Sequence, residues 1–284
     1  MIRVLDSGFF TSIQDAGRKR FQQFGVPQSG VMDNYASSMA NAIVGNTSEC
    51  AVLELTMVGP KLMFECATAI TVTGANMSPK INGVLISNFV LINVCRGDVL
   101  SFAASTIGFR SYLAVSGGFK TEVVMGSRSM HKNVTSNHCV NLGDILKINA
   151  TKRPIVSHAY IKYDNTYINE SEILITRGPE FDFLNSAQLS VLFQKEFTIS
   201  EKNNRMAYQI KELVVNQFKE IITSFVLPGT IQLTPSGQLI ILMRDAQVTG
   251  GYPRVFQLTE PSINVISQKM TNHKIRFKLE DSFT

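Results

Sequence analysis

Residues 69–115 decide the fold, and their apolar segments read Ala69-Ile-Thr-Val-Thr-Gly74, Lys80-Ile-Asn-Gly-Val-Leu85, Val90-Leu-Ile-Asn-Val94 and Phe109-Arg-Ser-Tyr-Leu-Ala-Val115. Each segment is about as long as a β-strand, and turn residues separate it from the next. Asn82-Gly83 is a dipeptide preferred in two-residue hairpin turns, because both residues tolerate positive φ. The spacing therefore predicts a largely antiparallel β architecture.

Helices are few in the predicted fold. The clearest spans Asn34–Val44, where apolar residues recur at helical spacing. Asp33 is a favourable N-cap for it, and Gly45 a favourable C-cap. A second helix is expected over Glu180–Phe193. The predicted fold class is therefore mainly β with few helices.

The chain length predicts two domains. The chain has 284 residues, and domains run at roughly 100–200 residues. Residues 151–170 are polar and show little periodicity. We therefore expect an N-terminal β-rich domain over residues 1–150, a linker over 151–170 and a C-terminal domain over 171–284.

Composition argues against several classes of protein. Hydrophobic residues make up 44% and charged residues 17%, so long disordered stretches are not expected. The net charge of +5 contains no run of five or six basic residues, so nucleic acid is not an expected partner. The four cysteines neither show CxxC spacing nor cluster with the four histidines, so no metal site is expected. The sequence shows no membrane span and no signal peptide, which predicts a cytoplasmic protein.

Two glycine-rich segments, Gly25–Asp33 and Leu227–Pro253, form the candidate functional site. Glycines mixed with Asp, Gln, Thr and Ser suit a place where bare backbone approaches a small polar ligand. In the second segment the apolar run Leu239–Met243 delivers Asp245 and Gln247 to the end of a buried strand. The alternative interpretation of this segment is a structural hairpin loop.

Two carboxylates have a structural and a functional interpretation. Asp33 either caps the helix that follows it or binds a ligand beside Gly30, and one residue can do both. Glu54 lies inside an apolar run, and if buried it needs a partner such as Arg18 or Arg128. The sequence contains no GxSxG, HExxH, Walker or GxGxxG motif. The chemistry therefore rests on carboxylates, arginines, amides, hydroxyls and backbone N–H groups.

A series of motifs spans nearly the whole chain in order. They are Phe10–Arg18, Gly25–Asp33, Ala40–Asn46, Leu53-Glu54, Gly59-Pro60, Thr73–Ala75, Arg110–Gly118, Gly126–Arg128, Arg177–Pro179, Arg205–Tyr208, Pro228–Gly237 and Asp245–Pro253. Together they resemble the allophanate hydrolase subunit 2 family, which includes KipA-like proteins, the C subunit of 5-oxoprolinase and one half of the carboxyltransferase domain of urea carboxylase. The resemblance implies two β-barrel-like domains, the C-terminal one cyclophilin-like, that face each other across a cleft.

The resemblance also implies a function. It points to a component like the C subunit of an ATP-dependent 5-oxoprolinase, which opens the lactam 5-oxoproline to glutamate. The implied partners are a KipI-like B subunit and a LamB/YcsF-like A subunit. ATP is expected in the complex, and no covalent biotin on this chain, because the sequence lacks a Met-Lys-Met attachment motif. Two alternatives stay open: a component of a biotin-dependent carboxyltransferase or allophanate hydrolase-type enzyme for urea or a related amide, and a KipA-like antagonist of a KipI-like kinase inhibitor.

Site residues follow from the motifs and the resemblance together. For substrate positioning or proton transfer we expect Asp245, Gln247 and Thr249. For substrate binding we expect Gly30, Asp33, Gln232, Gly250, Gly251 and Tyr252, with Arg18 and Arg128 as charge partners. The sequence departs from the family at Ser224, Ala207 and Ala246, where relatives usually carry an acidic residue, a glycine and an arginine. An arginine lost at position 246 removes a fork that pairs a substrate carboxylate.

Overall fold

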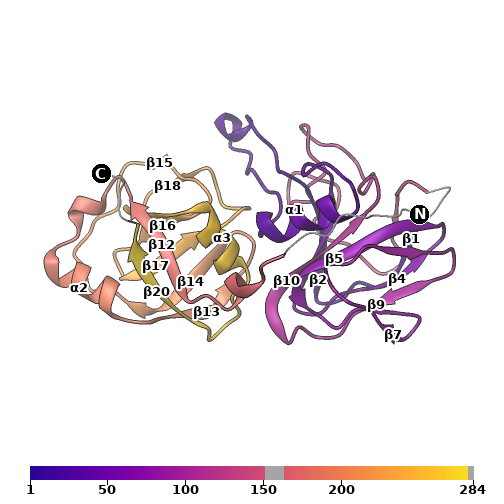
Figure 1. Cartoon of the computed structure of the whole chain (residues 1–284). Helices are drawn as coiled ribbons and strands as arrows, with labels where there is room; N and C mark the ends of the chain where they lie inside the picture. Colours follow the sequence, from indigo (N-terminus) through magenta and orange to yellow (C-terminus); the bar gives the residue numbers. More distant parts are fainter. Residues whose placement is uncertain (151–162, 281–284) are drawn as a thin grey trace. The chain divides into compact units, whose positions relative to one another are not determined.

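The computed structural model describes residues 1–150 and 163–280, which form two compact units (Figure 1). Unit 1 contains Met1–Lys19 and Ser29–Ile168, and unit 2 contains Arg20–Gln28 and Asn169–Thr284. Most of the expected linker, residues 151–162, lies outside the described residues. The domain boundaries therefore stay a prediction.

Unit 1 is built mainly from two antiparallel sheets. One has the strand order β11-β1-β4-β9-β6-β7 and the other β2-β3-β10-β5-β8. The strands are β1 Ile2–Asp6, β2 Phe10–Gln14, β3 Val52–Thr56, β4 Lys61–Phe64, β5 Thr68–Asn76, β6 Lys80–Ile81, β7 Val84–Leu85, β8 Ile92–Val94, β9 Val99–Ser101, β10 Ile107–Val115 and β11 Ile145–Leu146. The hairpin β6–β7 turns at Asn82 (φ 51°) and Gly83 (φ 85°), which confirms the turn predicted from the sequence.

The five-stranded sheet is covered on both faces. Side chains alternate along a strand, so Leu53 and Leu113 face one side while Val52 and Tyr112 face the other. The first pair belongs to the core shared with the six-stranded sheet, and the second pair packs with helix α1 (Asn34–Ile43). A polar residue on the second face is therefore buried beneath α1. Glu54 occupies such a position.

Unit 2 is a closed barrel with the strand order β12-β19-β16-β17-β14-β13-β20 (Figure 1). Its strands are β12 Glu172–Arg177, β13 Phe197–Asn203, β14 Ala207–Leu213, β16 Thr230–Leu233, β17 Gln238–Leu242, β19 Arg254–Leu258 and β20 Lys274–Leu279. All neighbouring pairs are antiparallel except β12 and β20, which run parallel. The rings of Phe197, Phe256 and Phe277 are buried; Phe277 stacks on Phe256 and contacts Phe197 in a tilted arrangement. A separate ladder pairs β15 (Ser224–Phe225) with β18 (Thr249–Gly250).

The described helices only partly match the sequence-based expectation. Helix α1 begins at Asn34 behind the cap Asp33, as predicted. Helix α2 (Ser186–Gln194) begins later than the predicted Glu180, because Phe181–Phe183 forms a 3-10 turn and Asn185 caps the helix in a capping box with Gln188. Helix α3 (Glu260–Ser267) was not predicted, although its cap Thr259 and the proline that follows are a usual start signal. Short 3-10 turns also lie at Gln22–Phe24 and Thr166–Ile168.

The mainly β fold class with few helices is confirmed, and one unit contains a closed barrel. The cyclophilin-like character of the C-terminal unit stays a prediction. Among residues 1–150 and 163–280, no helix has the length and apolar character needed to cross a membrane.

Candidate functional site

A buried carboxylate, Glu54, lies on β3 of the five-stranded sheet in unit 1, between β2 and the central strand β10. The strand register places it opposite Ser12 on β2 and opposite Tyr112 on β10. Its Oε2 accepts hydrogen bonds from the Tyr112 hydroxyl at 2.9 Å and from the Met32 backbone N–H at 2.8 Å. The Nε of Arg110 lies 3.8 Å from Oε1, and both side chains are at most 2% exposed. Glu54 is thus compensated by at least one cation and two donors, as a buried charge requires.

Asp33 extends this network to the start of helix α1. Its side chain accepts from the Ala36 N–H at 2.9 Å, which is the capping bond. Its own N–H donates to the Tyr112 hydroxyl at 2.8 Å, and its Oδ2 accepts from the Tyr167 hydroxyl at 2.6 Å. Asp33 is fully buried. The capping interpretation of Asp33 is confirmed, while its binding of a ligand stays a prediction.

The phenols of this network stay protonated at neutral pH. Burial, and then the charges of Glu54 and Asp33, raises the pKa of Tyr112 well above its ordinary value. Burial is also the main cause of the raised pKa of Tyr163 and of Tyr167, whose hydroxyls lie 3.1 Å apart. The hydroxyls of Tyr112 and Tyr167 therefore donate to the carboxylates of Glu54 and Asp33, and that of Tyr163 pairs with Tyr167. As protonated phenols they do not act as general bases at neutral pH.

Asp15 organises the loops beside the first glycine-rich segment. Its carboxylate accepts from the hydroxyls of Ser127 and Ser129 at 2.6 and 2.7 Å, and from backbone N–H groups of Gly17 and Arg128 at 2.9 and 2.6 Å. The bonds from Ser127, Arg128 and Ser129 each join residues at least 112 positions apart in the chain. The motif around Asp15 therefore holds together two segments that are far apart in the sequence, which an ordinary turn does not do.

Gly30 packs against the backbone of this anchor. Its φ is 94°, and a Cβ at this position would lie 3.1 Å from both the Asp15 carbonyl oxygen and the Gly17 nitrogen. The next residue, Val31, donates its N–H to the same carbonyl at 3.0 Å. Chain geometry alone thus requires glycine here, which gives Gly30 a structural role alongside the predicted ligand contact.

Glu54 has an ion-pair partner that the sequence analysis did not name, and the pairing of Glu54 with Arg18 or Arg128 stays a prediction. The ion pair described for Glu54 is with Arg110, which lies two positions before Tyr112 on β10 and hence on the same face. Arg18 donates to the Ser129 carbonyl and Arg128 to the Thr121 carbonyl. Side chains alternate along a strand, so Arg110 and Tyr112 on β10 share a face. This pattern could have identified Arg110 from the sequence, but it was not used.

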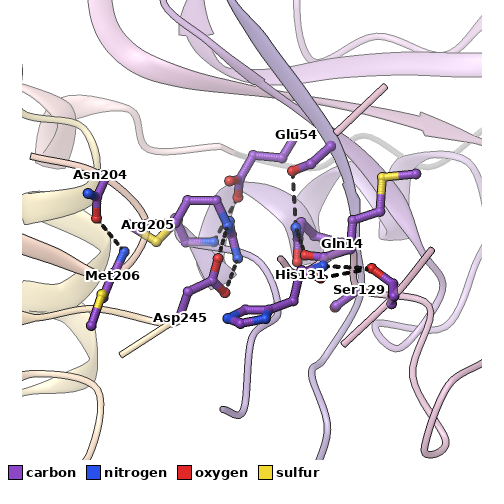
Figure 2. Close-up of polar contacts among 12 residues, drawn as sticks. Gln14, Glu54, Ser129, His131, Asn204, Arg205, Met206 and Asp245 are labelled. Atoms are coloured by element: carbon purple, nitrogen blue, oxygen red, sulfur yellow. Dashed lines mark hydrogen bonds and ion pairs between the residues drawn. The ribbon is translucent and has the colours of Figure 1, made fainter. Parts of the chain in front are cut away.

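In unit 2, Asp245 forms a two-point ion pair with Arg205 (Figure 2). The Nε and Nη2 atoms of Arg205 donate to the two carboxylate oxygens at 2.9 and 3.1 Å. Arg205 lies in the turn between β13 and β14, where the Met206 N–H donates to the Asn204 side chain at 2.7 Å (Figure 2). The Asp245 N–H also donates to the Arg205 carbonyl at 2.9 Å. Asp245 is therefore held in place by both its backbone and its side chain.

Three of the predicted residues of unit 2 lie together. The Nε2 of buried Gln232, on β16, donates to the Tyr252 carbonyl at 3.3 Å. A Cβ at Gly250 would lie 2.5 Å from that Nε2, so the glycine leaves room for the amide. Gly251 accepts the Ile221 N–H at 2.8 Å, which ties down the preceding loop. Thr249 is exposed in the β15–β18 ladder.

Gln247 carries an unused acceptor. Its Oε1 atom is buried and accepts no hydrogen bond from any residue in the described part of the chain. An amide oxygen in that state suits an N–H group supplied by a ligand. Gln247 is therefore the predicted residue of unit 2 with the clearest structural reason to meet a substrate.

Comparison with known proteins places this architecture. The sequence matches the family described as carboxyltransferase domain, subdomain A and B, over residues 24–279. The chain belongs to this carboxyltransferase family. The family resemblance drawn from the motifs is thereby confirmed.

Three relatives of this carboxyltransferase-family chain differ in how much of their length it spans. The chain is 29% identical over 283 residues to the C subunit of 5-oxoprolinase from Escherichia coli (strain K12), in a match that covers 98% of this chain and 90% of the relative. The solved structure of K. lactis urea amidolyase is similar with a TM-score of 0.86 and 26% identity, over 97% of this chain and 18% of that chain. The crystal structure of TTHA0988 has a TM-score of 0.88 and 23% identity, over 98% of this chain and 56% of that chain. This last likeness shows the fold alone.

The sequence analysis missed several residues of the two polar networks, the one around Glu54 and Asp33 and the one around Asp245. Tyr112, Arg110 and Arg205 all lie inside the motifs named above, yet none was assigned a role. The first glycine-rich segment is divided between the units: Ser29–Asp33 belongs to unit 1, whereas Gly25–Gln28 belongs to unit 2 together with the second segment, Leu227–Pro253. A cleft that both segments share stays a prediction.

Proposed function

We propose that this chain is a component like the C subunit of an ATP-dependent 5-oxoprolinase. The observation that carries the proposal is the extent of similarity to the E. coli protein, in a match that covers 98% of this chain and 90% of the relative. The urea amidolyase relatives are matched over only 12% of their length. The match over 90% of the E. coli protein supports a role like that of this subunit.

The proposed chemistry opens a resonance-stabilised lactam. Transfer of the terminal phosphoryl group of ATP to the lactam oxygen releases ADP and activates the ring. Water then adds to the same carbon, the C–N bond breaks, phosphate leaves, and the ring nitrogen gains a proton that the water supplies. Gln247 would accept the lactam N–H through its buried Oε1, which fixes the ring orientation. Asp245, held by Arg205, would place a carboxylate for proton transfer to the leaving nitrogen.

The proposal assigns partners and a cofactor outside this chain. A KipI-like B subunit and a LamB/YcsF-like A subunit would complete the enzyme, and ATP would be consumed by the complex. The isolated chain is expected to be folded and inactive, and to form a stable complex with the KipI-like partner. Robust 5-oxoproline turnover by the chain alone would contradict this.

The test is ATP-dependent release of glutamate from 5-oxoproline by the chain co-purified with its co-encoded partners. Gln247→Leu keeps the size and removes the acceptor, so KM for 5-oxoproline should rise about tenfold, the loss of roughly one hydrogen bond. Gln194→Leu, at the exposed end of α2, is the matched control and should leave KM unchanged. A complex that assembles yet releases no glutamate from 5-oxoproline would contradict the proposal.

A second candidate function follows from the family itself. The carboxyltransferase family match and the urea amidolyase relatives favour carboxyl transfer to urea or a related amide. Carboxybiotin would have to come from another chain. Urea-dependent loss of carboxyl from carboxybiotin in the assembled complex, without glutamate release, would select this function. Binding of the KipI-like partner with neither activity would select the KipA-like regulatory role.

A further inference from the structure

A cavity of about 500 Å³ opens in unit 1, outside the networks around Glu54 and Asp33. Its wall comes from three stretches of chain, residues 120–122, 128–137 and 145–147. The lining residues are Lys120, Thr121, Glu122, Arg128, Met130, Thr135, Ser136, Asn137, Ile145 and Lys147. The volume lies in the range of small-molecule sites.

Three cations line this cavity. The backbone brings two of them together, because the Lys120 N–H donates to the Lys147 carbonyl at 2.8 Å. The third, Arg128, donates from Nη1 to the Thr121 carbonyl, which fixes its guanidinium in the wall. None of the three forms an ion pair with any residue in ranges 1–150 and 163–280. Their charges are therefore not balanced by the described chain.

The single acid in the wall is hydrogen-bonded to another residue of the same wall. Glu122 accepts hydrogen bonds from the N–H and the hydroxyl of Ser136, at 2.9 and 3.1 Å. With three cations and one anion, the lining carries a formal charge of +2. Clustered charge of one sign at a concave surface concentrates counter-ions of the opposite sign. The cavity is therefore built for an anion.

A neighbouring cavity in unit 1 differs from this one in the charge of its lining. It measures about 290 Å³ and shares Lys120 and Arg128, but Asp15 and Glu49 also line it. Two acids there balance the two shared cations. The charge excess is thus specific to the larger cavity, on the side where Lys147 lies.

We propose that the larger cavity binds a small organic phosphate, with Lys120, Arg128 and Lys147 holding the phosphate group. A phosphate monoester carries a charge of about −2 on one compact group at neutral pH, which matches the +2 lining, whereas a single carboxylate carries about −1. Arginine and lysine donors are the usual partners of phosphate oxygens. Met130 and Ile145 supply an apolar wall against which the organic part packs.

This site does not depend on the proposed 5-oxoprolinase function, and its test needs no turnover. The full chain is titrated by calorimetry with ADP, inorganic pyrophosphate and succinate, each at low and at physiological salt. We expect ADP and pyrophosphate to bind and succinate to bind at least about tenfold more weakly. Lys120→Gln and Lys147→Gln should each weaken phosphate binding about tenfold, because each removes a charged donor.

Lys80→Gln is the matched control, since it removes one exposed positive charge from β6, outside the cavity. It should leave the affinity for phosphate unchanged, and thermal melts should show that all three variants fold. ADP should bind more tightly than pyrophosphate, because only ADP has an organic part to pack on the apolar wall. Absence of binding at millimolar concentration, or equal weakening by Lys80→Gln, would overturn the proposal.

Discussion

Tyr112→Phe tests whether the buried network around Glu54 stabilises unit 1. The substitution removes one hydroxyl, which donates to Glu54 Oε2 at 2.9 Å and accepts from the Asp33 N–H at 2.8 Å. The phenyl ring keeps its place in the packing beneath α1. The change therefore isolates two hydrogen bonds without opening a large cavity.

The size of the effect follows from the character of the two bonds. A hydrogen bond to a charged acceptor contributes about 1.5–3 kcal/mol to the free energy of unfolding, and a neutral one about 0.5–1.5 kcal/mol. Both bonds lie in a fully buried environment where water cannot replace the hydroxyl. Tyr112→Phe should therefore lower the free energy of unfolding by about 2–4 kcal/mol.

The assay is urea-induced unfolding of the full chain, with Tyr35→Phe as the matched control. Tyr35 accepts one long bond, 3.3 Å, from the Asp164 N–H, and its side chain is only partly buried. Loss of this bond should cost about 0.5 kcal/mol. A loss under about 1 kcal/mol for Tyr112→Phe, or equal losses for both variants, would refute the network as a source of stability.

The same variant should change the response to alkaline pH. The folded-state pKa of Tyr112 is raised well above 10 by burial and by the nearby carboxylates, while the unfolded chain ionises at about pH 10. Above about pH 10 the folded state therefore holds more protons, and stability falls as pH rises. The slope of this fall should be shallower for Tyr112→Phe, and an unchanged slope would contradict the assignment.

Further variants test three separate features. Gly30→Val should lower the melting temperature strongly, because φ is 94° and a Cβ would lie 3.1 Å from the Asp15 carbonyl oxygen; an unchanged melting curve with lost substrate binding would favour a purely ligand-facing role. Arg205→Gln and Asp245→Asn should each lower turnover of the assembled enzyme about 100-fold, and the double variant no further, since the pair acts as a unit; multiplying losses would show independent roles. Burial lowers the pKa of Lys269 to about 8 in the folded state, whereas the unfolded chain keeps this proton up to about pH 10.4. The free energy of unfolding should therefore rise between about pH 8 and about pH 10.4. Lys269→Met should abolish that rise, as measured by urea unfolding at a series of pH values.

Local chemistry made much of the fold predictable. The Asn82-Gly83 turn and the Asp33 cap depend on a few adjacent residues, and both have the predicted structure. The start of α2 was misplaced because the Asn185 capping box, also local, was overlooked in favour of apolar spacing. Helix α3 was missed for a similar reason, since its apolar positions carry weaker signals than its Thr259 cap.

The polar networks could not be predicted in the same way, because they depend on strand register. Glu54 and Tyr112 are 58 positions apart and become neighbours only when β3 pairs with β10. Arg205 and Asp245 are 40 positions apart and meet through a turn and the segment that follows β17. Sequence spacing shows which residues share a face of one strand, but not which strand lies beside it. The motifs therefore included these residues without revealing their partners.

Asp33 shows how a structural and a functional role constrain each other. One of its carboxylate oxygens, Oδ1, accepts the capping N–H of Ala36, and the other, Oδ2, accepts the Tyr167 hydroxyl at 2.6 Å. A carboxylate oxygen accepts up to two hydrogen bonds, so a ligand donor that reached Oδ2 would share it with the Tyr167 hydroxyl. Asp33 therefore fixes the start of α1 and the position of the neighbouring Met32 N–H that reaches Glu54, and a ligand contact would have to be compatible with both roles.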